Sequence, residues 1–562
     1  MQGSDARQKL SDLAREARAA IWRAATVARV GHEKRMHTVL RWPGAKVLLR
    51  ELPKGKQNPS LIFRFQAENA PHRAGLVVPG PPERAYSFYE MNDKMDRVGL
   101  ALSRRGFGRG TAALLMIKNR PEFVLVQPGL GRIGGAAVSV SWRSTPAEVE
   151  YVARHSGARA LFFDVDIADT VRAALPNLPG IPKENVFSVG GKVDGFSSFE
   201  ELIAGVQGMG PDESEEAAVV MYTSGTTGKP KGAVRKFQSS AMASALAFLG
   251  QTPLMVDEVH LAVCPLYHAT AFGFLGLGYL LGHSAVLLPE FKPEAFLDAI
   301  QRYRVTNTAV VPTMLQRLLD FGKDRIRAYD TSSLKAIFCG GAPLSAPLAN
   351  QVMDVLGDKL YNFYGATETG LVTLASPEDL RHSPGTIGKV VPGVEIRLVD
   401  ESGREAADGQ VGELYTRSAM LVDGYHADPD ATAASMLQGF FSVGDLARRD
   451  ARGCYHIEGR KRDMIISGGV NVYPAEVEAV LHEHPEVAEA AVIGAEDRDL
   501  GERVRAFVVL RAGATVDGDG LKSYCKGRLS GPKVPRDFVF LDSLPHNPTG
   551  KVLKRELRER AP

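Results

Sequence analysis

The sequence is poor in cysteine and in net charge, and each shortage excludes a class of protein. Its 562 residues include four cysteines, which lie far apart and form no CxxC pair. We therefore expect neither a zinc site nor a disulfide framework, and a reducing, cytoplasmic setting. The 68 basic and 65 acidic side chains leave a net charge of only +3, which is too weak to predict a nucleic-acid partner.

Long uninterrupted apolar runs are also lacking. The first residues alternate charged and apolar side chains, so we expect no secretory signal. The most apolar stretch, residues 269–289, approaches the roughly 20 residues that a membrane crossing needs. It contains several glycines and His283, and it ends in the β-like run 284–288. The sequence therefore predicts a buried helix followed by a buried strand.

Apolar side chains in residues 1–35 recur at the spacing of an amphipathic helix: Leu10, Leu13, Ala17, Ile21 and Ala24. We expect this helix to dock on its own protein. The alternative is a peripheral contact with a membrane through Leu10, Ile21 and Trp22.

The remaining chain is too long for one hydrophobic core and indicates an α/β protein with several domains. From about residue 85 to 400, short aliphatic runs alternate with longer helical patterns, as in βαβ units around a buried parallel sheet. After about residue 390, closely spaced short strands predict a β subdomain. The segment from residue 463 onward, with a helix expected at 474–482, predicts a small α+β domain.

A loop rich in glycine and threonine spans residues 222–232 and reads Tyr-Thr-Ser-Gly-Thr-Thr-Gly-Lys-Pro-Lys-Gly. It follows an apolar strand, and ligands bind at the ends of strands in open sheets. Thr223 and Pro230 exclude the nucleoside-triphosphatase loop, which needs Gly and Ser or Thr at those places. Glycines admit an anion close to the backbone, and hydroxyls and lysine supply donors and charge. The loop predicts a triphosphate site formed by Thr223, Ser224, Gly225, Thr226, Thr227, Gly228 and Lys229.

This loop and four further motifs resemble, in order and spacing, the adenylate-forming superfamily of acyl-CoA synthetases, adenylation domains and luciferases. The further motifs are Tyr-Asn-Phe-Tyr-Gly-Ala-Thr-Glu-Thr at 361–369, Gly-Asp at 444–445, Gly-Arg at 459–460 and Pro-Thr-Gly-Lys at 548–551. The resemblance runs from about residue 60 to the end. It implies an acyl-CoA synthetase that uses ATP, Mg²⁺ and coenzyme A as co-substrate.

The resemblance also implies the domain plan. A large N-terminal domain would hold two sheet-and-helix lobes and a β subdomain, and a small mobile α+β domain would close over it. On this chain we expect an N-terminal helical extension at 1–60, the AMP-binding domain at 61–459, a hinge at 460–462 and the mobile domain at 463–562. A homodimer is a further expectation.

Each matched residue receives a role by the same resemblance. Thr223 and Glu368 would lie on the magnesium side, which suits a cation held by one or two protein oxygens and by phosphates. The remaining nucleotide contacts are Thr367 near the α-phosphate, Tyr364 stacked on adenine beside Gly365, Asp445 on the ribose hydroxyls, Arg460 on ribose or phosphate, and Gly340, Gly341 and Ala342 in a wall shared with the acyl group.

Lys551 is the predicted catalytic residue of the first half-reaction. When a carboxylate attacks the α-phosphate, two anions approach each other, and one ammonium between them offsets their repulsion. At about 4 Å and an effective dielectric near 20 this contributes on the order of 4 kcal/mol. If this free energy acts mainly in the transition state, it corresponds to roughly a thousandfold increase in rate.

The second half-reaction involves the segment 462–476. By resemblance it lines the pantetheine passage, with Gly468 and Gly469 admitting the thiol-bearing arm. Arg462 takes the hinge position, where the family more often carries Asp or Lys.

The acid pocket is expected around His268, which matches a position at the acyl entrance of the family. Its surroundings are apolar and disfavour amino acids. A fatty acid is our first expectation, and an aromatic acid of the cinnamate or benzoate type is the second. A ligase that loads a carrier protein, and a silent nucleotide-binding scaffold, are the remaining alternatives.

Overall fold

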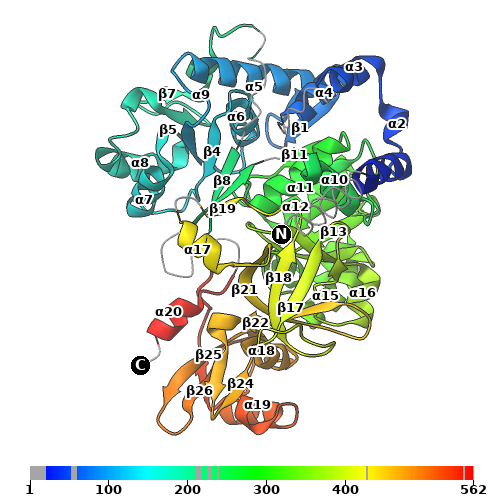
Figure 1. Cartoon of the computed structure of the whole chain (residues 1–562), viewed down its shortest axis with the longest axis vertical. Coiled ribbons are helices and arrows are strands. Elements are labelled where there is room, and N and C mark those ends of the chain that lie inside the picture. The colour runs from blue at the N-terminus through cyan, green and yellow to red at the C-terminus, as the bar shows by residue number, and fades with distance from the viewer. Residues whose placement is uncertain are drawn as a thin grey trace, which may run out of the picture.

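The computed structural model describes residues 21–51, 58, 60–208, 210, 218–223, 231–236, 239–425, 428–547 and 551–560. Two large sheets, with helices between them and on their outer faces, form the body of the molecule (Figure 1). Both contain a run of parallel strands, as the alternating pattern of the sequence predicts. The α/β class is confirmed.

The first sheet has nine strands and is parallel from β1 to β14, with antiparallel strands at both edges. In spatial order they are β16 (Lys389–Val390), β15 (Gly370–Ala375), β14 (Leu360–Ala366), β13 (Ala336–Cys339), β12 (Asn307–Val310), β10 (Val259–Ala262), β11 (Ser284–Leu287), β1 (Ala74–Val78) and β2 (Arg84–Ser87).

The second sheet has eight strands, of which β9 and β19 are antiparallel to their neighbours. In spatial order they are β19 (Gly424–Tyr425), β9 (Lys231–Lys236), β8 (Ala218–Thr223), β4 (Ala136–Ser139), β3 (Ala112–Met116), β5 (Ala158–Asp164), β6 (Val186–Val189) and β7 (Ser197–Ser198).

Helices fill three layers around these sheets. One buried cluster joins both sheets through α5 (Phe88–Ser103), α6 (Pro121–Arg132), α9 (Phe199–Ile203) and α11 (Ala269–Leu280). The outer face of the nine-stranded sheet carries α12 (Pro293–Tyr303), α13 (Pro312–Asp320), α14 (Lys323–Arg327), α15 (Ala346–Leu356) and α16 (Pro377–His382). The outer face of the eight-stranded sheet carries α7 (Pro146–Ser156) and α8 (Ala168–Ala174). The expected helix and strand at 269–289 are α11 and β11.

A β subdomain follows, as predicted. It contains β17 (Glu395–Val399), β18 (Gly412–Arg417), β20 (Met436–Leu437), β21 (Phe440–Arg449) and β22 (Tyr455–Arg460), with α17 (Pro429–Ala434) beside it. Hydrogen bonds join it to the nine-stranded sheet, because Ile387 donates to the Tyr455 carbonyl at 2.9 Å and Tyr455 donates to the Gly388 carbonyl at 2.9 Å. A Cβ on Gly388 would meet the Leu374 backbone at 2.1 Å, so this junction requires glycine.

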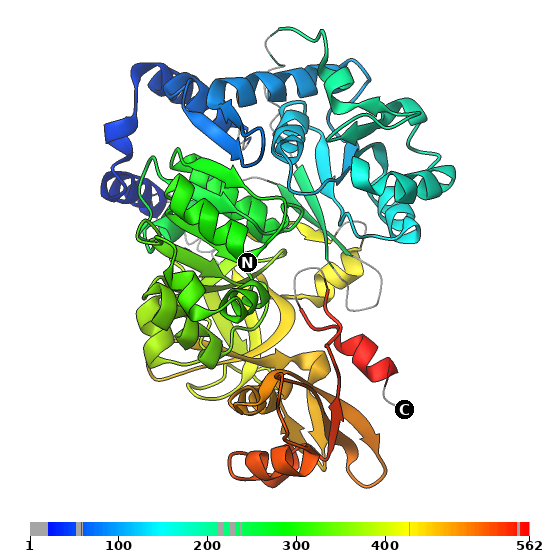
Figure 2. The same cartoon turned by 180° about the vertical axis from the view of Figure 1, so that it is seen from behind.

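The C-terminal domain lies at one end of the molecule, away from the eight-stranded sheet (Figure 2). It has its own buried core, and its helix at 474–482 is confirmed. Its elements are β23 (Ile465–Ser467), β24 (Val470–Val472), α18 (Pro474–His482), β25 (Val487–Asp497), β26 (Gly501–Leu510), α19 (Gly518–Lys526), β27 (Asp537–Phe540) and α20 (Lys554–Glu559).

Helices at the N-terminal end pack on the nine-stranded half. They are a helix at residues 21–33, α2 (Met36–Val39), α3 (Trp42–Glu51) and α4 (Leu61–Asn69), next to α10 (Ser239–Leu249). The predicted amphipathic helix is described only from residue 21; Leu10, Leu13 and Ala17 lie outside the described residues. Trp22 packs on Gly393, whereas Ile21 is 70% exposed.

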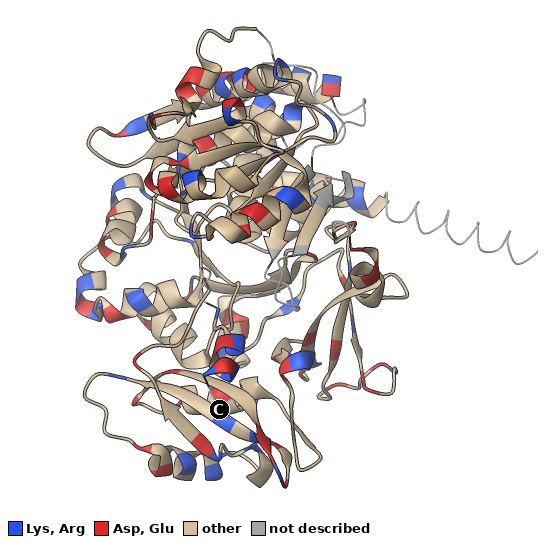
Figure 3. Ribbon diagram, turned by 90° about the vertical axis from the view of Figure 1, so that its left-hand side faces the viewer, with Lys and Arg blue, Asp and Glu red and all other residues tan. Residues whose placement is uncertain are grey.

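Charged side chains of both signs are interspersed along the ribbon (Figure 3). Within the described ranges, no helix combines the length and apolarity that a membrane crossing requires. The four cysteines are free and buried.

Candidate active site

A cavity of about 2000 Å³ lies where the lobes, the β subdomain and the C-terminal domain meet. One end is lined by polar and charged side chains and the other by apolar ones. Of the predicted site residues, those that line it are His268, Gly340, Gly341, Ala342, Tyr364, Gly365, Thr367, Glu368, Asp445, Arg460, Arg462 and Lys551.

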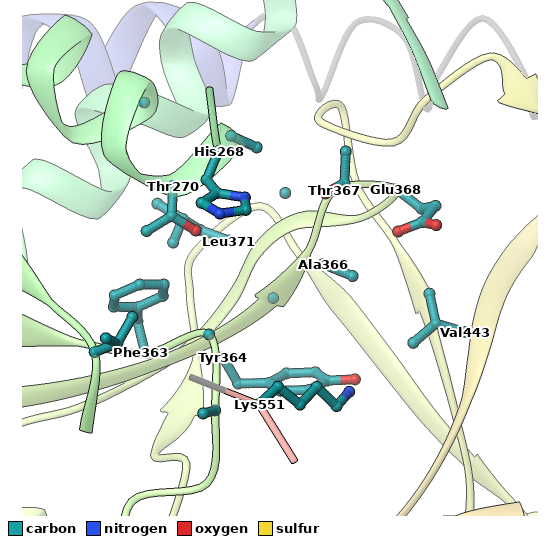
Figure 4. Close-up of a pocket in the computed structure, with 18 of the residues that line it drawn as sticks. His268, Thr270, Phe363, Tyr364, Ala366, Thr367, Glu368, Leu371, Val443 and Lys551 are labelled. Carbon is teal, nitrogen blue, oxygen red and sulfur yellow. The ribbon is translucent and has the colours of Figure 1, made fainter. Parts of the chain in front are cut away.

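The hairpin between β14 and β15 carries the central motif. At Gly365 the strand pairing shifts by one residue, and a Cβ there would meet the Gly370 carbonyl oxygen at 2.0 Å. Only glycine allows this close crossing, so the position of the hairpin tip depends on it. The tip holds Thr367 and Glu368 at the edge of the cavity (Figure 4).

Asp445 is tied to two neighbours at the polar end. The Tyr364 hydroxyl donates a hydrogen bond to its Oδ2 at 2.7 Å, and Arg460 Nε lies 3.1 Å from its Oδ1. Asp445 and Arg460 face each other across β21 and β22, so strand register sets the ion pair. Burial, with the Asp445 charge next, raises the pKa of Tyr364 well above its usual value. A carboxylate has about four acceptor positions, so Asp445 keeps capacity for ribose hydroxyls.

Glu368 is the carboxylate best placed for a cation. It is 7% exposed, and the Tyr425 hydroxyl donates to its Oε1 at 3.3 Å. Within the described chain, no group of three or more His, Cys, Asp or Glu side chains could hold a metal. A magnesium ion held mainly by phosphate needs only one or two carboxylates, so Glu368 fits that ion.

Lys551 reaches this end of the cavity from the C-terminal domain. Its backbone N–H donates to Asn547 Oδ1 at 2.8 Å, and its side chain extends beside the ring of Tyr364 (Figure 4). Burial, followed by the nearby charge of Arg460, lowers the pKa of the Lys551 amine to about 8. A buried ammonium in this setting is stabilised when an anion binds beside it and balances its charge. Pro548, Thr549 and Gly550 lie outside the described residues.

The link between the domains is short and charged. Arg462 lines the cavity, and burial lowers the pKa of its guanidinium from the usual value. Its neighbour Asp463 pairs with Arg558 of α20 at 2.8 Å. Gly468 and Gly469 form the turn between β23 and β24 with φ of +58° and +78°, and they do not line the cavity. The structure therefore does not bring these two glycines to the other predicted residues.

The predicted triphosphate loop is described only at its margins. Thr223 ends β8 and residue 231 begins the antiparallel strand β9. Ser224, Gly225, Thr226, Thr227, Gly228 and Lys229 lie outside the described residues, as does the side chain of Thr223.

His268 stands where the polar and apolar ends meet. It immediately precedes α11, and its ring packs on Tyr267 with the centroids 4.2 Å apart. Burial lowers its pKa to about 4, so the imidazole is neutral near pH 7. Among the described residues, no donor or acceptor meets its Nε2.

The apolar end follows one face of α11. Gly273, Gly276 and Leu280 line the cavity, as do Met242 and Leu246 of α10. A Cβ added to Gly273 or Gly276 would meet no non-neighbouring atom of the described part of the chain within 4 Å, so the space beside them is open there.

Sequence reasoning missed two functional features of this cavity. It interpreted the glycines of residues 269–289 only as evidence against a membrane crossing. The three-residue spacing of Gly273 and Gly276 in an apolar helix was the signal that could have indicated the channel. Tyr425, which contacts Glu368, gave no signal because it lies outside every motif.

Comparisons with known proteins agree with this arrangement. Residues 63–426 match the model of the AMP-binding enzyme family, and residues 476–551 match that of the AMP-binding enzyme C-terminal domain. Feruloyl-CoA synthase of Amycolatopsis sp. is 34% identical over 502 residues, which are 88% of this chain and 97% of that protein.

Two further similar proteins are a fatty-acid ligase and a solved structure with ATP bound. The fatty acid–[acyl-carrier-protein] ligase ScoC of Streptomyces coeruleorubidus is 31% identical over 88% of this chain and 95% of its own. The crystal structure of ATP-bound MatB from Rhodopseudomonas palustris superimposes with a TM-score of 0.80 at 30% identity, covering 90% of this chain and 99% of that one.

Proposed function

We propose, given that the chain belongs to the AMP-binding enzyme family and is an ATP-dependent acid–CoA ligase, that its acid substrate is a fatty acid. One observation carries this proposal. The apolar end of the cavity continues along α11 past Gly273 and Gly276, where no non-neighbouring atom of the described residues lies within 4 Å of a Cβ added to either glycine. An aromatic acid would fill only the first part of such a channel, whereas an alkyl chain would follow it and bury its methylenes.

The polar end suits the first half-reaction. The acid's carboxylate oxygen attacks the α-phosphorus of ATP, the bond to the bridging oxygen breaks, and acyl-adenylate and pyrophosphate form. Mg²⁺, bound by the phosphates and Glu368, would neutralise charge on the leaving pyrophosphate. Asp445 would hold the ribose hydroxyls.

Lys551 would act in the same step. Its buried amine holds its proton more tightly when two anions approach. The anions raise its pKa above the value of about 8 that burial sets. The ammonium then lies between the carboxylate and the α-phosphate and offsets their repulsion. After pyrophosphate leaves, this role ends.

The second half-reaction needs a different arrangement. The CoA thiol must reach the carbonyl carbon of the adenylate, displace AMP and form the thioester. We assign the passage to Gly468 and Gly469, which lack side chains and lie away from the cavity in the present arrangement. Rotation of the C-terminal domain about residues 460–462 would bring these two glycines to the cavity and move Lys551 out of it.

A pyrophosphate-release screen tests the substrate proposal. Saturated acids of graded length and hydroxycinnamic acids are compared with ATP, Mg²⁺ and CoA. We expect kcat/KM to rise with chain length and to exceed that of the hydroxycinnamates. A profile that favours hydroxycinnamates and ignores chain length would reject the fatty acid.

An aromatic acid is the second candidate. His268 Nε2 has no hydrogen-bond partner among the described residues, and a hydroxyl or carboxylate on a ring could meet it. The similarity to feruloyl-CoA synthase supports the same class. Product analysis separates both candidates from carrier-protein loading, in which acyl-adenylate accumulates even when CoA is present.

A further inference from the structure

We propose that the N-terminal helices at residues 21–51 form the far wall of the acyl channel and set which chain lengths fit. This inference rests on the proposed fatty-acid substrate. These helices precede the family match, which begins at residue 63. The wall would therefore lie outside the part of the chain that the family model matches.

Side chains from three of these segments line the same cavity as α11. They are Val27 of the first helix, Met36 of α2 and Leu48 of α3, followed by Leu61, Ile62 and Phe65 of α4. All six are apolar. They would meet the methyl end of a chain whose carboxylate lies near His268.

The length of the channel can be read from α11. The helix begins next to His268 and ends at Leu280, which also lines the cavity. Its twelve residues span on the order of 16 Å. The extended alkyl chain of a long-chain fatty acid covers that distance, so still longer acids would press against the N-terminal helices.

The wall is fixed to the body of the molecule. Lys34 Nζ donates to the Thr252 carbonyl at 2.5 Å, and burial lowers the pKa of this amine. On the other side, Asn69 accepts from the Arg41 N–H at 2.7 Å and donates to the Val39 carbonyl at 3.1 Å. Gln66 of α4 donates to the Tyr279 carbonyl of α11 at 2.9 Å. These bonds hold the wall at a set distance from α11.

Two neighbouring leucines of α3 offer a matched pair. Leu48 lines the cavity, while Leu49 is 67% exposed and does not. Leu48→Trp should fill the end of the channel, and Leu49→Trp should add the same bulk to the surface. We expect Leu48→Trp to lower kcat/KM for the longest accepted acids by roughly tenfold or more. Short acids should change little, and Leu49→Trp should keep the wild-type profile.

The outcomes are separable. If the wild type ignores chain length, the proposed substrate fails and the wall fails with it. If the wild type favours longer acids but Leu48→Trp keeps the same profile, only the wall is rejected. An equal loss at every length in a variant with normal melting also rejects it.

A labelling experiment guards against misfolding of the tryptophan variant. The four native cysteines are buried, so a new thiol should react first with a maleimide. Leu48→Cys should be protected several-fold by a long saturated acid with AMP but not by butyrate, whereas Leu49→Cys should react equally with either. Protection of neither or both positions would overturn the proposal.

Discussion

The two ends of the cavity are built differently. At the nucleotide end, Tyr364, Asp445 and Arg460 form a chain of polar contacts with fixed donors and acceptors. At the acyl end, the wall is made of apolar side chains and of two glycines at which an added Cβ would meet no non-neighbouring atom of the described residues within 4 Å. One end is suited to recognise a ligand by directed bonds and the other by the volume that it leaves open.

This difference separates the reaction type from the substrate. Directed bonds require particular residues at particular spacings, so relatives that use different acids can share the nucleotide end. Open volume can be made from many apolar residues, so the acyl end differs freely between relatives. The sharpest tests therefore change one end and measure the function of the other.

Removing the amine at the nucleotide end should have the largest effect. In Lys551→Ala we expect adenylation to fall roughly a thousandfold, because the repulsion between carboxylate and phosphate is no longer offset. Thioester formation from supplied acyl-adenylate should stay within a few-fold. Pyrophosphate release and acyl-CoA formation measure the two steps, with the exposed Lys526→Ala as the control.

Gly469→Leu should give the reverse pattern. The residue has φ of +78°, which strains any side chain, and the added leucine would narrow the assigned thiol passage. Equal loss of both steps in the Lys551 and Gly469 variants would reject a separate arrangement for each half-reaction.

Filling the acyl end should have the next largest effect on activity. In Gly276→Leu the new side chain enters open space, so the fold is kept while the channel is blocked. We expect kcat/KM for long acids to fall roughly tenfold or more, with the KM for ATP unchanged. Gly278→Ala is the matched control, because its Cβ would make ordinary contacts with His283 and His260 in the core. A changed KM for ATP would show that the two ends are coupled.

A change of pH perturbs the nucleotide end less than these substitutions do. Below pH 8 the Lys551 amine of the free enzyme is protonated and active; above its pKa of about 8 it becomes neutral. The kcat/KM of adenylation should therefore fall roughly tenfold per pH unit above 8. In Lys551→Arg the remaining activity should lose this fall, since a guanidinium stays charged. An alkaline limb that persists in that variant would assign the titration to another group.

The smallest effect is expected from Tyr364→Phe. It removes the hydrogen bond to Asp445 but leaves the pair with Arg460, at a cost of about 1 kcal/mol. We expect a few-fold rise in the KM for ATP and no change in the preference for acids. Tyr361→Phe, on the same strand, serves as the control.

Three residues that the sequence singles out for the polar end come together in the fold, and there is a physical reason for this. Glu368, Asp445 and Lys551 each lie in a short motif whose spacing is dictated by strand ends and tight turns, and all three line one cavity. The main strands and the helix at 474–482 also follow from apolar periodicity.

The apolar end could not be predicted in the same way. Leu48 and Met36 have the same residue types as core positions, and only the fold shows that they face open space. Tyr425 reaches Glu368 because β19 pairs with β9, a contact between strands far apart in the chain. The place of Gly468 and Gly469 in the reaction rests on the proposed rotation of the C-terminal domain, which no sequence motif specifies.

The backbone junction at Gly388 has a consequence for how the enzyme melts. Because strand hydrogen bonds join the β subdomain to the nine-stranded sheet, the two should unfold as one cooperative block. The C-terminal domain has a separate core and a connection of few residues, so it should lose its structure in its own calorimetric transition. A nucleotide bound at the proposed site would contact both blocks, so its binding should draw the two transitions together.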